Sequence, residues 1–265
     1  MVLSSRQNPI VARYRAAAHG DTREVMLLDG AHLVDDALDA GVHMREAAVT
    51  TTADDDDELR SLIAALEAAH VEVITVTTAV MDALSPVRSS SAIVALADRP
   101  AAGGTAMYAG PAALVVMAID VQDPGNLGAI VRVAEAGGAT GVVAAGACAD
   151  PFGWKALRGS MGSALRLPIA VTPDADAAIG AARRAGCRIV ATTPRSGQPL
   201  FDARLVGPSM LLIGGEGAGL PHAIIKMADE RVTIPMAVSV ESLNAAVTAA
   251  LLVYEARRQR ATSQQ

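Results

Sequence analysis

The sequence predicts an α/β protein in which a small N-terminal α/β domain precedes a larger domain built on a parallel sheet. Three observations predict this arrangement. Short apolar runs alternate with helical periodicity along residues 111–260, which is typical of buried parallel strands joined by helices. Residues 1–98 carry a shorter α/β pattern of their own. The Gly- and Ala-rich stretch 101–110 reads as a linker, so we divide the chain into 1–100, 101–110 and 111–265.

The N-terminal domain is expected to alternate helices and strands. A first helix opens at Ser4–Pro9 and continues to about Ala18. The apolar residues of 32–40 recur at helical spacing, which predicts a second helix there. The remaining expected elements are a helix over 58–70 and strands over 25–28, 47–51, 71–76 and 93–96.

The C-terminal domain is expected to contain five apolar strands with helices between them. These strands cover 114–121, 141–145, 188–192, 209–213 and 231–234. A long last helix runs from Leu243 to about Arg258 and is apolar on nearly all sides until Glu255. Such a helix is buried within its domain or in a subunit interface.

Composition excludes several classes of protein. Of the 265 residues 51% are hydrophobic, which excludes a disordered chain. Two cysteines cannot form a disulfide framework or a four-cysteine zinc site, and no Cys/His cluster predicts a metal. The longest uncharged run, 100–119, contains Pro and Gly and reads as linker and strand, so no membrane helix is expected. With no signal peptide at the N-terminus, we expect a soluble cytoplasmic protein.

The net charge of −6 is unevenly distributed. Residues 1–100 carry 8 Lys and Arg against 16 Asp and Glu, whereas residues 101–265 carry 14 against 12. The overall charge argues against non-specific binding of polyanions, but it leaves room for a local basic surface.

Three segments that follow predicted strands carry candidate functional residues, because ligands of parallel sheets bind at the carboxyl ends of strands. In the first, 123–132, Asn126 can cap a helix and Arg132 points away from the apolar stripe of that helix. This pattern fits a plain capped helix with an exposed arginine. It also fits an Asn and an Arg held at the sheet edge for an anionic or hydroxyl-bearing substrate.

The second segment, 214–221, has four glycines in six positions, which indicates close approach of the backbone to a ligand or a tight turn. It matches neither a Walker A loop nor the dinucleotide-binding GxGxxG motif, and the carboxylate of Glu216 would repel a phosphate. The third segment joins Ile234-Pro235-Met236 to Ser242 and Asn244, where Ser242 is a good N-cap for the last helix.

In this order and spacing, the three segments resemble the SpoU (TrmH-type) branch of the SPOUT RNA ribose 2′-O-methyltransferases. The resemblance rests on Asn126 with Arg132 six residues later, GGEGAGL at 214–220, IPM at 234–236 and SLNAAVTAALLVYE at 242–255. The N-terminal domain, with NP at 8–9 and LLDGAHLVDDAL at 27–38, is similar to the L30e-like RNA-binding domain that members of this family carry.

The resemblance implies a deep trefoil knot in the C-terminal domain, which forms the binding site for S-adenosylmethionine without a metal. The residues expected to bind this cofactor are Thr192, Thr193, Gly214, Gly215, Glu216, Gly217, Gly219, Ile234, Pro235, Met236, Leu243 and Asn244. Arg132 would act on the ribose 2′-hydroxyl, and Asn126, Glu216, Ser242 and Asn244 would position it and the loops. Because a guanidinium hardly ever loses its proton, Arg132 either stabilises the developing oxyanion or clamps the adjacent phosphate.

The resemblance also implies a homodimer that acts on RNA, with the last helix and the knot at the subunit interface. The expected RNA-binding residues are basic: Arg6, Arg13, Arg15, Lys155, Arg158 and Arg166. An L30e-like domain and the lack of a long basic C-terminal extension favour ribosomal RNA, of the 23S type, over tRNA. A non-catalytic RNA-binding relative is the alternative from another class, and a Rossmann oxidoreductase is disfavoured by the missing GxGxxG motif.

Overall fold

The chain folds into two compact units in the computed structural model, which describes residues 2–262. Unit 1 comprises the chain through Pro100 together with Phe152–Arg166, and unit 2 comprises Ala101–Pro151 and the chain from Leu167 onward. The division expected from the sequence differs at two points. It assigned Phe152–Arg166 to the C-terminal domain, and it treated 101–110 as a linker, whereas this stretch belongs to unit 2 and buries Met107 and Tyr108 there.

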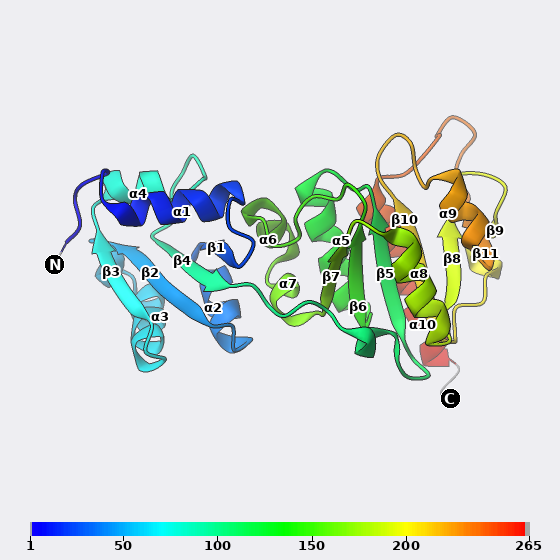
Figure 1. Ribbon diagram of the computed structural model, residues 1–265, viewed down its shortest axis with the longest axis horizontal. Helices are drawn as coiled ribbons and strands as arrows, with labels where there is room; N and C mark the ends of the chain where they lie inside the picture. The colour runs from blue at the N-terminus through cyan, green and yellow to red at the C-terminus, as the bar shows by residue number, and fades with distance from the viewer. Residues whose placement is uncertain (1, 263–265) are drawn as a thin grey trace. The chain divides into compact units, whose positions relative to one another are not determined.

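Unit 1 is built on a four-stranded mixed sheet with the strand order β1-β4-β2-β3 (Figure 1). Its strands are β1 (Val25–Asp29), β2 (Met44–Thr50), β3 (Glu72–Val76) and β4 (Ile93–Asp98). β4 is antiparallel to both of its neighbours, while β2 and β3 are parallel. The accompanying helices are α1 (Pro9–His19), α2 (Ala31–Asp39), the 3₁₀ turn η1 (Ala53–Asp55), α3 (Asp57–Ala68) and α4 (Thr78–Leu84). The sequence predicted all of these but η1 and α4.

Two helices from the middle of the chain, α6 (Trp154–Ser160) and α7 (Ser163–Arg166), complete unit 1. α6 packs on β1, and Arg166 forms an ion pair with Asp36 of α2 at 2.8 Å. The guanidinium of Arg99 lies over the ring of Phe152 at 5.8 Å. These partners are more than 50 residues away in sequence, so local periodicity could not assign the segment to unit 1.

Unit 2 is built on a seven-stranded parallel sheet with the order β7-β6-β5-β10-β8-β11-β9 (Figure 1). Its strands are β5 (Leu114–Ile119), β6 (Gly141–Ala145), β7 (Ile169–Thr172), β8 (Arg188–Thr192), β9 (Gln198–Pro199), β10 (Ser209–Gly214) and β11 (Glu230–Thr233). The predicted parallel sheet is confirmed. The two edge strands β7 and β9 were missed because they are only four and two residues long, and because prolines flank β7 and one of the two residues of β9 is itself a proline.

Helices cover both faces of the parallel sheet. They are η2 (Thr105–Tyr108), α5 (Pro124–Ala136), α8 (Ala175–Arg184), η3 (Leu200–Asp202), α9 (His222–Met227) and α10 (Ala245–Thr262). Val115 and Met117 of β5 join a buried cluster with residues of α8 and α9. Alternation along a strand turns the residues between them to the opposite face, where α5 and α10 pack on each other. Within residues 2–262, no helix is long and apolar enough to cross a membrane.

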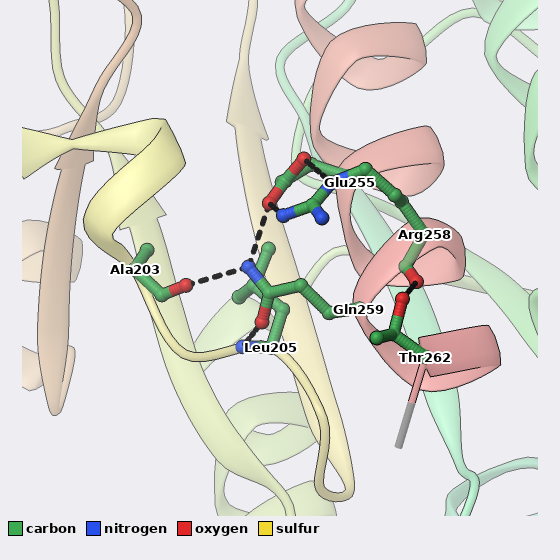
Figure 2. Close-up of polar contacts among 6 residues, drawn as sticks. All are labelled: Ala203, Leu205, Glu255, Arg258, Gln259 and Thr262. Carbon is green, nitrogen blue, oxygen red and sulfur yellow. Dashed lines mark hydrogen bonds and ion pairs between the residues drawn. The ribbon is translucent and has the colours of Figure 1, made fainter. Parts of the chain in front are cut away.

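Polar contacts fix the last turns of α10 to the chain before β10 (Figure 2). The Gln259 amide donates to the carbonyl of Ala203 at 2.7 Å and accepts from the backbone N–H of Leu205 at 2.8 Å. It also donates to Glu255, whose buried carboxylate is paired with Arg258 at 2.7 Å. The helix is therefore held by specific hydrogen bonds as well as by its apolar side chains.

Candidate active site

A pocket of about 380 Å³ lies at the carboxyl ends of β8, β10 and β11 in unit 2. This volume is within the usual range for small-molecule sites, and the position is where a parallel sheet binds its ligands. Of the residues expected to bind a cofactor, all but Pro235 line it: Thr192, Thr193, Gly214, Gly215, Glu216, Gly217, Gly219, Ile234, Met236, Leu243 and Asn244. Ser242 lines it too. The cavity is therefore formed mainly by three stretches that are distant in sequence, 192–194, 213–220 and 232–248.

Pro194 and Ala218, which belong to stretches expected to bind the cofactor, line the pocket as well. Six further residues of the lining were not expected from the sequence: Ile213, Leu220, Ile225, Val232, Ala245 and Thr248. Some of them had a signal that could have found them. Thr248 is one helical turn after Asn244, and Val232 is two positions before Ile234 on a strand, so each repeats the direction of an expected residue. Ile225 lies on α9 and had no such signal.

The glycines of the 214–219 loop are required for two different reasons. A Cβ on Gly214 would overlap the backbone of Gly219, and a Cβ on Gly215 would overlap the backbone of Asp120. Gly217 and Gly219 have open space around the Cβ position, but their φ values of +86° and +65° are in the left-handed region. The loop therefore combines close backbone packing with two turns that favour glycine.

A chain of side-chain hydrogen bonds links the start of α5, which does not line the pocket, to two segments that do. The Asn126 amide donates to the Glu216 carboxylate, and the Asn244 amide donates to the Asn126 carbonyl oxygen at 2.9 Å. Asn126 lies in the first turn of α5, Glu216 in the glycine loop and Asn244 directly before α10. In each asparagine the side-chain nitrogen donates one of these hydrogen bonds and the side-chain oxygen accepts another, which fixes the orientation of the amide.

Two expected helix caps are wrong. α5 is capped by Asp123, whose carboxylate accepts from the backbone N–H of Asn126 at 2.7 Å. α10 begins at Ala245, and the side chain of Asn244 accepts from the N–H groups of Ala246 and Val247. Asn126 and Ser242 do not cap these helices. Asn126 is thereby left to bond Glu216 and Asn244.

Arg132 is exposed on α5 and does not line the pocket. It is six residues after Asn126, which places it about 120° away around the helix. Among the described residues it has no hydrogen bond and no ion pair, so its guanidinium is available to a ligand.

The six basic residues expected to bind RNA all belong to unit 1. Arg13 and Arg166 are held by Glu46 and Asp36 in ion pairs of 2.7 and 2.8 Å. Arg6 and Arg15 each donate from Nε to a backbone carbonyl of α4, of Ala79 and of Ala83 respectively, which holds α1 and the residues before it against α4. Lys155 and Arg158 are exposed on α6, with the Lys155 ammonium 5.4 Å from the Trp154 ring.

The described residues offer little support for a metal site or a cysteine nucleophile. The described residues contain no group of three or more His, Cys, Asp or Glu placed to hold a metal ion. Cys148 accepts from the N–H of Val121 and donates to the carbonyl of Ala118, and burial raises the pKa of its thiol. It is therefore a neutral thiol near pH 7 and a weak nucleophile.

Comparison with known proteins identifies relatives along the whole chain. Residues 113–254 match the SpoU rRNA Methylase family. A Synechocystis protein named as an uncharacterized tRNA/rRNA methyltransferase is 30% identical over 97% of this chain and 93% of its own length. The 23S rRNA (uridine(2479)-2′-O)-methyltransferase of Streptomyces viridochromogenes is 43% identical over 52% of this chain and 50% of its own. The crystal structure of the SpoU methyltransferase AviRb from that organism, in complex with AdoMet, superposes with a TM-score of 0.88 at 30% identity, covering 97% of this chain and 99% of AviRb.

Proposed function

This chain belongs to the SpoU rRNA methylase family and is an RNA ribose 2′-O-methyltransferase that uses S-adenosylmethionine, and from this premise we propose that its substrate is 23S ribosomal RNA. The structural observation that supports the activity is the pocket at the ends of β8, β10 and β11, where residues of 192–194, 213–220 and 232–248 meet. The similarity of half of the chain to the 23S rRNA methyltransferase of Streptomyces viridochromogenes favours ribosomal RNA over tRNA. A ribosomal substrate would place the protein in the cytoplasm.

We propose that the cofactor lies against the glycine loop. The absence of side chains at Gly214 and Gly215 lets the backbone close tightly there, and Ile234, Met236 and Leu243 provide an apolar lining suited to an adenine ring. Thr192 donates its hydroxyl to the carbonyl of Leu212 at 2.9 Å, which fixes the other wall. The order of these segments fits a trefoil knot, which we propose they form.

When bound, S-adenosylmethionine would supply an electrophilic methyl group: the ribose 2′-oxygen would bond to the methyl carbon as the sulfur–methyl bond breaks to leave a neutral thioether, and the hydroxyl proton would pass to water. Arg132 is proposed to bind the substrate side of this reaction, because its guanidinium is exposed and unengaged within the described chain. A guanidinium that stays protonated stabilises negative charge on the 2′-oxygen or holds the adjacent phosphate. Asn126, Glu216 and Asn244 act as positioning residues, since their hydrogen bonds join the start of α5 to the loops of the pocket.

We propose that the protein is a homodimer through α10. Val247, Leu251 and Tyr254 recur at i, i+4 and i+7 on this helix and are all exposed. A stripe of this spacing is one face of a helix, and such a face is normally buried. Unit 1 is proposed to be the L30e-like RNA-binding domain, with Lys155 and Arg158 as its available cations.

The proposed function is tested with the Arg132→Ala variant and unmodified 23S rRNA transcribed in vitro. The wild-type chain should transfer tritiated methyl groups to this RNA and bind S-adenosylmethionine in a calorimetric titration. Arg132→Ala should lower methyl transfer by about a hundredfold or more, the typical loss of a group that stabilises transition-state charge, with unchanged cofactor affinity. Lost cofactor affinity would contradict a substrate-side role, and methylation of tRNA alone would replace the proposed substrate.

A further inference from the structure

Phe201 is an exposed aromatic residue in a chain that has few aromatic residues. It is one of two phenylalanines, and 64% of its surface is accessible, whereas Phe152 is buried. No other large apolar side chain of the segment 195–231 is exposed. A single exposed large apolar side chain in this segment does not form the contiguous patch that a protein partner would bury.

The backbone around Phe201 is firmly anchored. Leu200 and Ala203 on either side are buried. Gln259 of α10 binds Ala203 and Leu205, as Figure 2 shows, and the N–H of Gly197 donates to the hydroxyl of Thr233 at 2.9 Å. The ring is therefore presented to solvent by a fixed segment and not by a loose loop.

Two arginines lie on either side of Phe201 in the sequence, six residues before it and three residues after it. Arg195 and Arg204 are exposed, and within the described residues their side chains have no ion pair or hydrogen bond. The acids at the start of the neighbouring strand β11 are already engaged: Asp229 pairs with Arg183 and Glu230 with Arg188, each at 2.8 Å. Asp202 is the one acid between the two arginines in sequence. A chain of net charge −6 thus presents a local excess of positive charge here.

This surface continues from the edge of the cofactor pocket. Pro194, next to Arg195, lines the pocket. Pro199 pairs with Thr233, and Ile234, the residue after Thr233, also lines the pocket. An RNA strand whose ribose reaches the pocket can therefore extend over this edge of the sheet.

We propose that Arg195, Phe201 and Arg204, here named the edge surface, bind single-stranded RNA beside the nucleotide to be methylated. The Phe201 ring stacks on an unpaired base, and the two guanidinium groups contact backbone phosphates. Aromatic stacking with arginine–phosphate contacts is the chemistry by which proteins hold single-stranded RNA. The inference rests on the proposed function, since it assumes an RNA substrate at the pocket.

The test measures binding of 23S rRNA transcribed in vitro to the full chain, over a range of salt concentrations. Phe201→Ala should weaken RNA binding roughly tenfold, a typical loss for one stacked base, and Phe201→Trp should restore it. Arg195→Ala and Arg204→Ala should each reduce the slope of log affinity against log salt by about 0.7, the value for one phosphate of a single strand, whereas Phe201→Ala should leave the slope unchanged.

Val171→Ala is the matched control, because Val171 is a comparably exposed apolar side chain on β7, the opposite edge strand of the same sheet. It should leave RNA affinity unchanged, and all variants should keep wild-type affinity for S-adenosylmethionine. Equal RNA affinity of Phe201→Ala and wild type would overturn the inference, as would loss of a dimer in Phe201→Ala, which would make this edge a subunit contact. A wild-type chain that neither binds nor methylates the RNA would overturn the proposed substrate as well.

Discussion

Gly215 and Gly217 lie two residues apart in the pocket loop and constrain the site in different ways. Gly215 packs so closely on the backbone of Asp120, directly after β5, that a Cβ at this position would overlap the Asp120 carbonyl group. Gly217 has free space around it and is needed for its φ of +86°. The sequence indicated close approach at these glycines, but it could not separate packing from backbone conformation, because both favour the same residue.

Substitution should separate these two roles. Gly215→Ala is expected to force the loop away from β5 and to lower S-adenosylmethionine affinity by more than about tenfold. Gly217→Asn should keep most of the affinity, since asparagine tolerates the left-handed region better than other side chains. Calorimetric titration measures both. Tight binding by Gly215→Ala would show that the loop is not part of the cofactor site.

At the scale of the element, α10 runs from the pocket, at the carboxyl ends of the strands, to the residues just before β5 and β10. Asn244 caps its first turn and bonds Asn126, while Arg260 near its end donates to the carbonyls of Ala113, Leu205 and Gly207. Burial lowers the pKa of Arg260, yet hydrogen bonds to backbone oxygens satisfy the charged group. A helix fixed at both ends holds Asn244 in a constant position relative to the sheet.

Acid should weaken the attachment of α10. The ion pair with Arg258 holds the pKa of the buried Glu255 below its usual value. A carboxylate with a lowered folded pKa stabilises the fold above its unfolded pKa of about 4.3, and this contribution is lost as the pH falls below that value. Glu255→Gln is expected to lower the free energy of unfolding by about 1 kcal/mol at pH 7 and to flatten its decline between about pH 5 and 3. Urea unfolding at several pH values measures this, and equal pH dependence of variant and wild type would contradict it.

Most elements were predictable from sequence because their apolar residues form continuous runs or recur at helical spacing. The strands over 114–119 and 209–213 are of the first kind, and the helix within 32–40 is of the second. The helix caps were less predictable, since Asp123, Asn126, Ser242 and Asn244 are all competent to cap, and the position of the first helical residue decides among them. The bonds among Asn126, Glu216 and Asn244 join residues 90 and 118 positions apart, which no local pattern encodes.

At the scale of the whole molecule, the two units do not follow the order of the chain. Removing residues 1–100 would strip β1 and α2 from the segment 152–166 and expose Ala156 and Leu157, which are fully buried in the intact chain. The fragment 101–265 should therefore bind S-adenosylmethionine, since its pocket lies wholly in unit 2, but it should aggregate and bind RNA poorly.

Replacing 152–166 in that fragment by a short Gly/Ser linker should restore a monodisperse protein without restoring RNA binding. Light scattering and calorimetric titration measure the two properties. A fragment 101–265 that is soluble and methylates RNA as well as the full chain would show that unit 1 is dispensable.

The membership of α6 in unit 1 also determines which part of the protein tryptophan fluorescence monitors. Trp154 is the single tryptophan of the chain, and it lies in unit 1 although it follows β6 of unit 2 in sequence. Its emission therefore follows the melting of unit 1, while a ligand in the pocket stabilises unit 2 by mass action. Fluorescence-monitored denaturation would record little of the cofactor's effect, and an optical sensor of cofactor binding needs an indole introduced into unit 2.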